Sequence, residues 1–147
     1  MTSERELNTI IKNTLLNNGG WASKIADPQG KAVYTSIQNP FDGFGVIGNT
    51  PVYWEAKYMN KLASFNLQRI ENHQISNLCR IQELLTNSVC CIILGVKLSR
   101  NENRIYVFKD IIDINERRNN SQNFLKKELE SLPYFKVKAG IIQDFVL

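Results

Sequence analysis

Apolar side chains recur at helical spacing near the start of the chain, and they form one continuous face. They are Leu7, Ile10, Ile11 and Leu15. Ser3 is followed three residues later by Glu6, which is the pattern of a capping box at a helix N-terminus. The run Asn17-Asn18-Gly19-Gly20 is typical of a helix end. The pattern therefore predicts a first helix that begins after Ser3 and ends near Asn17.

A β-rich stretch follows, interrupted by Gly48-Asn49. Apolar residues at 44, 46 and 47 precede this pair, and Val52, Tyr53 and Trp54 follow it, which is typical of a hairpin with a two-residue loop. That loop places Asp42 directly opposite Glu55, on one face of the ribbon. Lys57 joins the same face because side chains on a strand alternate with a period of two.

The other segments predict a sheet flanked by helices. Residues 21–25 alternate, 27–30 read as a turn, and 32–37 as a further strand. Residues 70–85 predict an amphipathic helix and 89–96 a buried strand, with a second strand at 104–108. Residues 110–130 predict two helical pieces, the second capped by Ser121 and ended by Leu132-Pro133, before an edge strand at 134–138. The order predicts an α/β fold with a mixed central sheet flanked by helices.

Two facing carboxylates repel each other, so a sheet normally avoids this pair. A hard divalent cation such as Mg²⁺ would offset the repulsion, because it binds oxygen ligands and commonly uses one or two carboxylates. Lys57 would then supply a positive charge beside the ion. The alternative is a hairpin whose charges simply face water.

Length and charge narrow the class of protein. At 147 residues the chain fits a single domain, residues 1–147. The net charge of +4 and pI near 9.0 favour a polyanionic partner, with nucleic acid first. The three cysteines lack a CxxC spacing and predict reduced core residues, and no apolar run has the length of a membrane span. We therefore expect a cytoplasmic protein that makes no membrane contact.

Three segments within residues 3–95 resemble the RecU-type Holliday junction resolvases of the PD-(D/E)XK nuclease superfamily, and more distantly the archaeal resolvases. They are SERELNTIIKNTLLNNGG, FDGFGVIGNTPVYWEAK and SFNLQRIENHQISNL. The resemblance implies a restriction-endonuclease-like core and a structure-selective endodeoxyribonuclease. Such an enzyme would be a homodimer that makes paired, symmetric nicks in branched DNA, the four-way junction. RecU-type proteins carry a long insertion before the catalytic aspartate, whereas this chain has about a dozen residues between Ile25 and Asn39.

The resemblance also implies roles for particular residues. Glu4, or its neighbour Glu6, matches the glutamate of the first helix that completes the metal site. Asp42, Glu55 and Lys57 match the strand aspartate and the E-x-K pair. Mg²⁺, for which Mn²⁺ would substitute, is expected on Asp42, Glu55, the Ala56 carbonyl and Glu4, where it would polarise the phosphate and activate water. Gln68 matches a glutamine shared by RecU-type enzymes and is expected to be catalytic.

Basic residues near the expected site are candidates for phosphate contacts. We expect Lys61 and Arg69 to bind nucleic acid, because they flank the segment that follows the catalytic strand. Further candidates are Lys12, Lys24, Lys31, Arg80, Arg117, Arg118, Lys126 and Lys127.

Simpler interpretations and other functions stay open at this point. Glu4 could be an ordinary first-turn glutamate, Gln68 a solvated residue, and His73 an exposed residue without a catalytic role. The chain could also be a restriction-like, repair or exonucleolytic nuclease, or a non-catalytic nucleic-acid-binding module built on the same fold.

Overall fold

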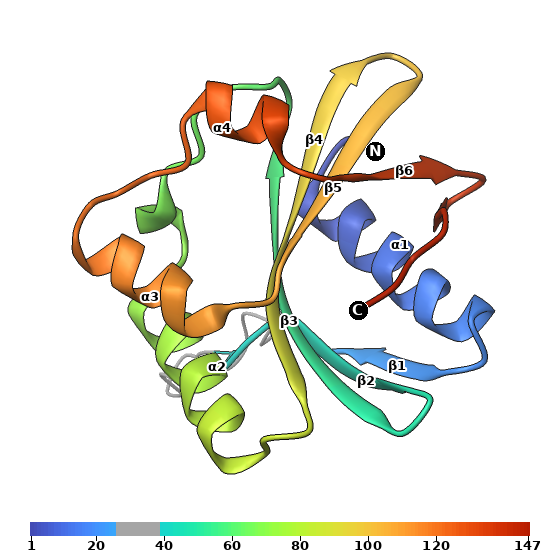
Figure 1. Ribbon diagram of the computed structural model, residues 1–147. Helices are drawn as coiled ribbons and strands as arrows, with labels where there is room; N and C mark the ends of the chain where they lie inside the picture. The colour runs from blue at the N-terminus through green and yellow to red at the C-terminus, as the bar shows by residue number, and fades with distance from the viewer. Residues whose placement is uncertain (26–38) are drawn as a thin grey trace, which may run out of the picture.

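Seven strands form one mixed sheet in the computed structural model, which describes residues 1–25 and 39–147 (Figure 1). The elements in chain order are α1 (Glu4–Asn17), β1 (Trp21–Lys24), β2 (Gly43–Ile47), β3 (Thr50–Met59), the 3₁₀ helix η1 (Leu67–Arg69), α2 (Asn72–Leu84), β4 (Val89–Ser99), β5 (Glu102–Phe108), α3 (Ile111–Asn119), α4 (Lys126–Ser131), β6 (Phe135–Lys138) and β7 (Ile141–Ile142). The strands lie side by side in chain order, and each neighbouring pair is antiparallel except β3 and β4. The predicted α/β class, a mixed sheet flanked by helices, is confirmed.

Helices cover both faces of the sheet (Figure 1). On one face α1 packs against the even-numbered positions of β3, and Leu7, Trp54 and Ile93 belong to this core. On the other face α2 and α3 pack against a second core that contains Leu78 and Ile92. The centre of β3 is therefore covered on both sides.

The central hairpin has the predicted register. Ile47 pairs with Thr50 across the Gly48-Asn49 loop, and the pairing continues to Gly43 and Trp54. Gly48 adopts a φ of +59°, which a residue without a Cβ adopts readily and which a tight hairpin turn requires. After β3 the chain crosses through η1 and α2 and returns as β4, parallel to β3. Two parallel strands need such a crossover.

The first helix begins as predicted, but half of its capping box is replaced. Ser3 Oγ accepts a hydrogen bond from the Glu6 backbone N–H at 3.2 Å. The Glu6 carboxylate, however, accepts from the backbone N–H and hydroxyl of Thr2 and pairs with the amino terminus. The prediction that Glu6 closes a reciprocal box with Ser3 was wrong. The groups that the Glu6 carboxylate binds belong to Thr2 and Met1, one and two residues before Ser3.

Two predictions in the C-terminal half were also wrong in detail. Ser121 is not a helix N-cap: it has a φ of +54°, and α4 begins only at Lys126. Between them, Phe124 pairs with Phe65 in an isolated β-bridge. The strand at 135–138 is confirmed, but it is not the edge, because β7 pairs beyond it.

The remaining predictions concern residues 27–37, the three cysteines and membrane-spanning helices. The predicted turn at 27–30 and strand at 32–37 lie outside the described residues. Cys79, Cys90 and Cys91 are free and buried, as predicted. Among the helices in the described ranges, none combines the length and hydropathy needed to span a bilayer.

Candidate functional site

Glu55 and Lys57 lie on the same face of β3, and both are buried in the middle of the sheet. Their side chains are two residues apart, so the strand period points both toward the face that α2 covers. The Glu55 side chain is 1 % exposed and that of Lys57 10 %, and Lys57 Nζ lies 2.9 Å from Glu55 Oε1. The interpretation of this hairpin as a set of charges facing water is therefore excluded.

Asp42 lies one residue before β2, so it does not pair with Glu55 in the ladder as the register predicted. Its backbone N–H donates to the Trp54 carbonyl at 3.0 Å. Its side chain turns back to β3, where Oδ2 accepts the Ala56 N–H at 2.9 Å. The carboxylate therefore takes the place of a backbone acceptor at the point where the two strands separate.

The electrostatics of Glu55 show that the two carboxylates act on each other. Burial raises the pKa of Glu55 from its ordinary 4.5 to about 7, and the negative charge of Asp42 adds to the rise. The Lys57 ammonium acts in the opposite direction. Within the described residues, the buried Glu55 Oε2 has no hydrogen-bond partner. A buried carboxylate oxygen without a donor is costly, and a bound cation would satisfy it.

Glu4 and Glu6 have separate surroundings, although they lie on the same turn of α1. Glu4 Oε1 lies 3.5 Å from Arg69 Nη2, and the charge of Glu4 is among the causes that raise the pKa of Glu55. Glu6 is instead held by Thr2 and the amino terminus, and the Thr2 hydroxyl lowers the pKa of Glu6. Of the two glutamates, Glu4 is the one whose charge acts on the Glu55 carboxylate.

A metal ion at this place would be held by few protein groups. In residues 1–25 and 39–147, no three side chains of His, Cys, Asp or Glu converge closely enough to hold an ion by themselves. The ligands expected from the sequence are Asp42, Glu55 and the Ala56 carbonyl, and of these the structure joins Asp42 to the Ala56 N–H. Mg²⁺ commonly takes one or two carboxylates and keeps several waters, so two carboxylates are a sufficient side-chain set for it.

The residues expected to act beyond the carboxylates occupy η1 and the end of β3. Gln68 Nε2 donates to the Arg118 carbonyl at 2.9 Å, so its amide joins η1 to α3. Lys61 and Arg69 line one surface pocket of about 350 Å³, together with Tyr58. Arg69 also donates to the Tyr58 carbonyl at 2.9 Å, which holds the guanidinium at the end of β3.

Two of the further phosphate candidates are engaged within the protein. Arg118 is buried and donates to the Ile70 carbonyl and to Asn72 Oδ1, at 2.8 and 2.7 Å. Arg117 stacks over the Phe124 ring and pairs with Glu128. Arg118 therefore stabilises the junction of α2 and α3. The prediction that it contacts phosphate was wrong, because its guanidinium is buried and bound within the protein.

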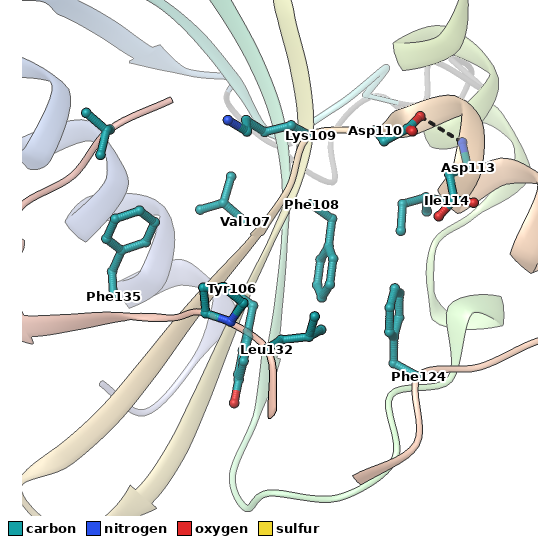
Figure 2. A pocket seen from close by; sticks show the side chains of 12 residues that line it. Tyr106, Val107, Phe108, Lys109, Asp110, Asp113, Ile114, Phe124, Leu132 and Phe135 are labelled. Atoms are coloured by element: carbon teal, nitrogen blue, oxygen red, sulfur yellow. Dashed lines mark hydrogen bonds between the residues drawn. The ribbon is translucent and has the colours of Figure 1, made fainter. Parts of the chain in front are cut away.

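A larger cavity of about 460 Å³ lies elsewhere, between the end of β5, the start of α3 and the residues around Leu132 (Figure 2). Aromatic rings such as Phe108 and Phe124 line it, and the Asp113 N–H donates to Asp110 at its rim. None of the residues predicted to be catalytic, to bind metal or to bind nucleic acid lines this cavity.

A protein-family match shows to which family this chain is related. Residues 22–145 match the family model described as RecU, Recombination protein U. The chain belongs to the RecU family. The match confirms the resemblance to the RecU family, and the mixed sheet flanked by helices confirms the predicted α/β class. The match also extends beyond residue 95, where the segments that carry the resemblance end.

Other comparisons add less. No curated protein matches the chain. Among solved structures, this RecU-family chain is similar to Archaeoglobus fulgidus Hjc, described as a Holliday junction resolvase from an archaeal hyperthermophile. The two are 17 % identical over 66 % of this chain and 70 % of Hjc, with a TM-score of 0.40. These values mark a remote likeness.

The RecU match includes Asp42, Glu55, Lys57 and Gln68, whereas Glu4 lies before its first residue. The sequence reasoning missed Asn8, whose buried side chain donates to Asp42 Oδ2 at 3.1 Å. A signal was present, because Asn8 is a polar residue inside the apolar stripe of the first helix. Such a residue needs a buried partner.

Proposed function

We propose that this chain is a divalent-metal-dependent endodeoxyribonuclease that resolves four-way DNA junctions by paired hydrolytic nicks. Membership of the RecU family supports DNA recombination as the setting. The single observation that carries the chemistry is the buried carboxylate of Glu55. This carboxylate lies beside Lys57, and burial, followed by the charge of Asp42, raises its pKa to about 7. One of its oxygens has no hydrogen-bond partner in the described part of the chain.

The residues present fit a hard divalent cation. Asp42, Glu55 and the Ala56 carbonyl would hold Mg²⁺ or Mn²⁺, with Glu4 reaching the ion or its water shell. The unpartnered Glu55 Oε2 and the pKa of about 7, which burial and the charge of Asp42 raise, indicate a carboxylate that the ion pair with Lys57 compensates only in part. When bound, the ion would supply positive charge to the scissile phosphate and lower the pKa of a water.

Lys57 would act on the reacting phosphate directly. Its ammonium is fixed by the ion pair with Glu55 and is nearly buried, so its charge is little screened by solvent. In this position it would stabilise the negative charge that grows on the phosphate oxygens in the transition state. The general base is then water rather than His73, whose ring lies against Glu71.

The DNA would be held by the basic residues near the end of β3. Arg69 and Lys61 line the same pocket, and Arg69 also contacts Glu4. Both would contact phosphates and give salt-dependent binding. A four-way junction has two equivalent strands to cut, so we expect a homodimer with two-fold symmetry.

The test is a cleavage panel on three proteins: wild type, Asp42→Asn, and the matched control Asp113→Asn, an exposed aspartate on α3. Each is given a synthetic four-way junction and a linear duplex of the same sequence, with Mg²⁺, Mn²⁺ or EDTA. We expect wild type and the control to nick the junction symmetrically only with metal. Asp42→Asn should bind the junction without cutting it. Metal-dependent cleavage by Asp42→Asn would overturn the assignment of the site.

The same panel distinguishes a second candidate, a nuclease that acts on linear or flapped DNA. The observation that favours this candidate is the short segment of residues 26–38, in a position where RecU-type proteins carry a long insertion. Equal rates on the junction and the duplex would support this second function and remove junction resolution.

A further inference from the structure

The side chain of Asn8 joins the first helix to both arms of the catalytic hairpin. Asn8 is 3 % exposed. Its Nδ2 group donates to Asp42 Oδ2 and to the Glu4 carbonyl, both at 3.1 Å. Its Oδ1 accepts the indole N–H of Trp54 at 2.8 Å. One buried amide therefore contacts the aspartate before β2, a tryptophan on β3 and the backbone of α1.

Trp54 determines which way the Asn8 amide points. An indole nitrogen can only donate a hydrogen bond, so the Asn8 atom that faces it must be the oxygen. The Asn8 NH₂ group must then face Asp42. Gly43 makes this arrangement possible, because any Cβ at this position would collide with the Trp54 ring.

Asn8 also determines which oxygen Asp42 has free. Asp42 Oδ2 accepts two hydrogen bonds, one from the Ala56 N–H at 2.9 Å and one from Asn8. A carboxylate oxygen has two lone pairs, so both acceptor positions of Oδ2 are occupied. This leaves Oδ1 as the Asp42 oxygen that can ligate a cation without losing a hydrogen bond.

We propose that Asn8 is a positioning residue, oriented by Trp54, that fixes the Asp42 carboxylate so that Oδ1 is presented to the metal ion. This inference rests on the proposed function and adds a residue that lies before the range matched by the family. Groups that hold a metal ligand in place typically contribute 10- to 100-fold to metal affinity or activity. A purely structural Asn8 would contribute only to stability.

The experiment compares Mn²⁺ binding, measured by electron paramagnetic resonance, with stability measured by urea unfolding in EDTA. Asn8→Leu is the informative variant, because it keeps the volume but can neither donate to Asp42 nor accept from Trp54. Asn8→Ala removes both contacts. Thr14→Val is the matched control, since Thr14 is also a buried polar residue of α1 and accepts the Ile142 N–H at 2.9 Å, far along the helix from Asp42.

We expect both Asn8 variants to weaken Mn²⁺ binding by about 10- to 100-fold. Thr14→Val should be less stable than wild type yet bind Mn²⁺ with unchanged affinity. Trp54→Phe, which keeps Asn8 but removes the donor that orients it, should weaken Mn²⁺ binding less than Asn8→Ala does. It also serves as a second test if Asn8→Ala does not fold.

One result would overturn the inference alone, and a second would overturn it together with the proposed function. If wild type binds Mn²⁺ and cuts DNA, but the Asn8 variants bind Mn²⁺ as tightly as Thr14→Val, then Asn8 has only a structural role. If wild type neither binds Mn²⁺ nor cuts DNA, the proposed function itself fails and the positioning role falls with it.

Discussion

In the metal-free protein, replacing Glu55 by glutamine should raise the free energy of unfolding relative to wild type, and the rise should be larger at alkaline pH than at acidic pH. The pKa of Glu55 is about 7 in the folded protein against an ordinary value of 4.5, so the folded state binds the proton more tightly than the unfolded state. The stability that protonated Glu55 contributes is therefore fully present below pH 4.5 and is lost as the pH rises through 7. Each pKa unit is worth about 1.4 kcal/mol, which gives about 3 kcal/mol in total, most of it lost between pH 5 and pH 8.

The assay is urea unfolding of wild type and Glu55→Gln in EDTA at pH 5 and pH 8. Glutamine keeps the size of the side chain and carries no charge. The stability that wild type loses when Glu55 ionises is therefore not lost in the variant. Relative to wild type, the free energy of unfolding of the variant should rise by about 2 to 3 kcal/mol from pH 5 to pH 8. Exposed Glu83 provides the control. The difference in the free energy of unfolding between Glu83→Gln and wild type should be the same at both pH values. A Glu55→Gln difference that is also independent of pH would refute the account of Glu55 as a buried carboxylate whose pKa is raised by burial and by Asp42.

Three further predictions concern the groups around Glu55. Glu4→Gln should weaken Mn²⁺ binding and cleavage while Glu6→Gln leaves both intact, measured by titration and nicking assays; equal effects would contradict the assignment to Glu4. Arg69→Ala should weaken DNA binding and lower the slope of log K against log salt by about 1, whereas exposed Arg80→Ala should not; an unchanged slope would remove Arg69 from the DNA contacts. Lys57→Met should lower kcat by about 10²- to 10³-fold in single-turnover cleavage, and a smaller loss would argue against direct action on the phosphate.

Much of the fold could be predicted because its signals are local. The Gly48-Asn49 loop determined the register of the central hairpin, and the apolar stripe determined α1. Other features depend on contacts between distant parts of the chain. β7 contains two residues and carries no readable pattern, yet the Ile142 N–H is bound by Thr14 in α1. Ser121 could not be excluded as a cap, because the bridge from Phe124 to Phe65 is a tertiary contact.

In the candidate site, too, some features follow from local spacing and others depend on contacts between distant parts of the chain. The spacing of Glu55 and Lys57 on one strand face followed from the sequence, and the structure adds their burial and ion pair. The sequence also predicted that Asp42 faces Glu55 in a regular ladder. The strands separate before that point, and the Asp42 side chain binds the Ala56 N–H instead. The contribution of Asn8 depends on packing between α1 and the hairpin, which spacing along the chain does not reveal.

The most direct test of a shared cation is crystallography of the protein with Mn²⁺, using anomalous diffraction to locate the ion. The account predicts one peak that contacts a carboxylate oxygen of Asp42 and one of Glu55, at roughly the 2.0 to 2.1 Å typical of a small divalent ion, with Asp42 contributing Oδ1. It also predicts that the peak is absent from crystals of Asp42→Asn. An Mn²⁺-soaked wild-type crystal with no peak between these two carboxylates, in a protein that still cuts DNA, would contradict it.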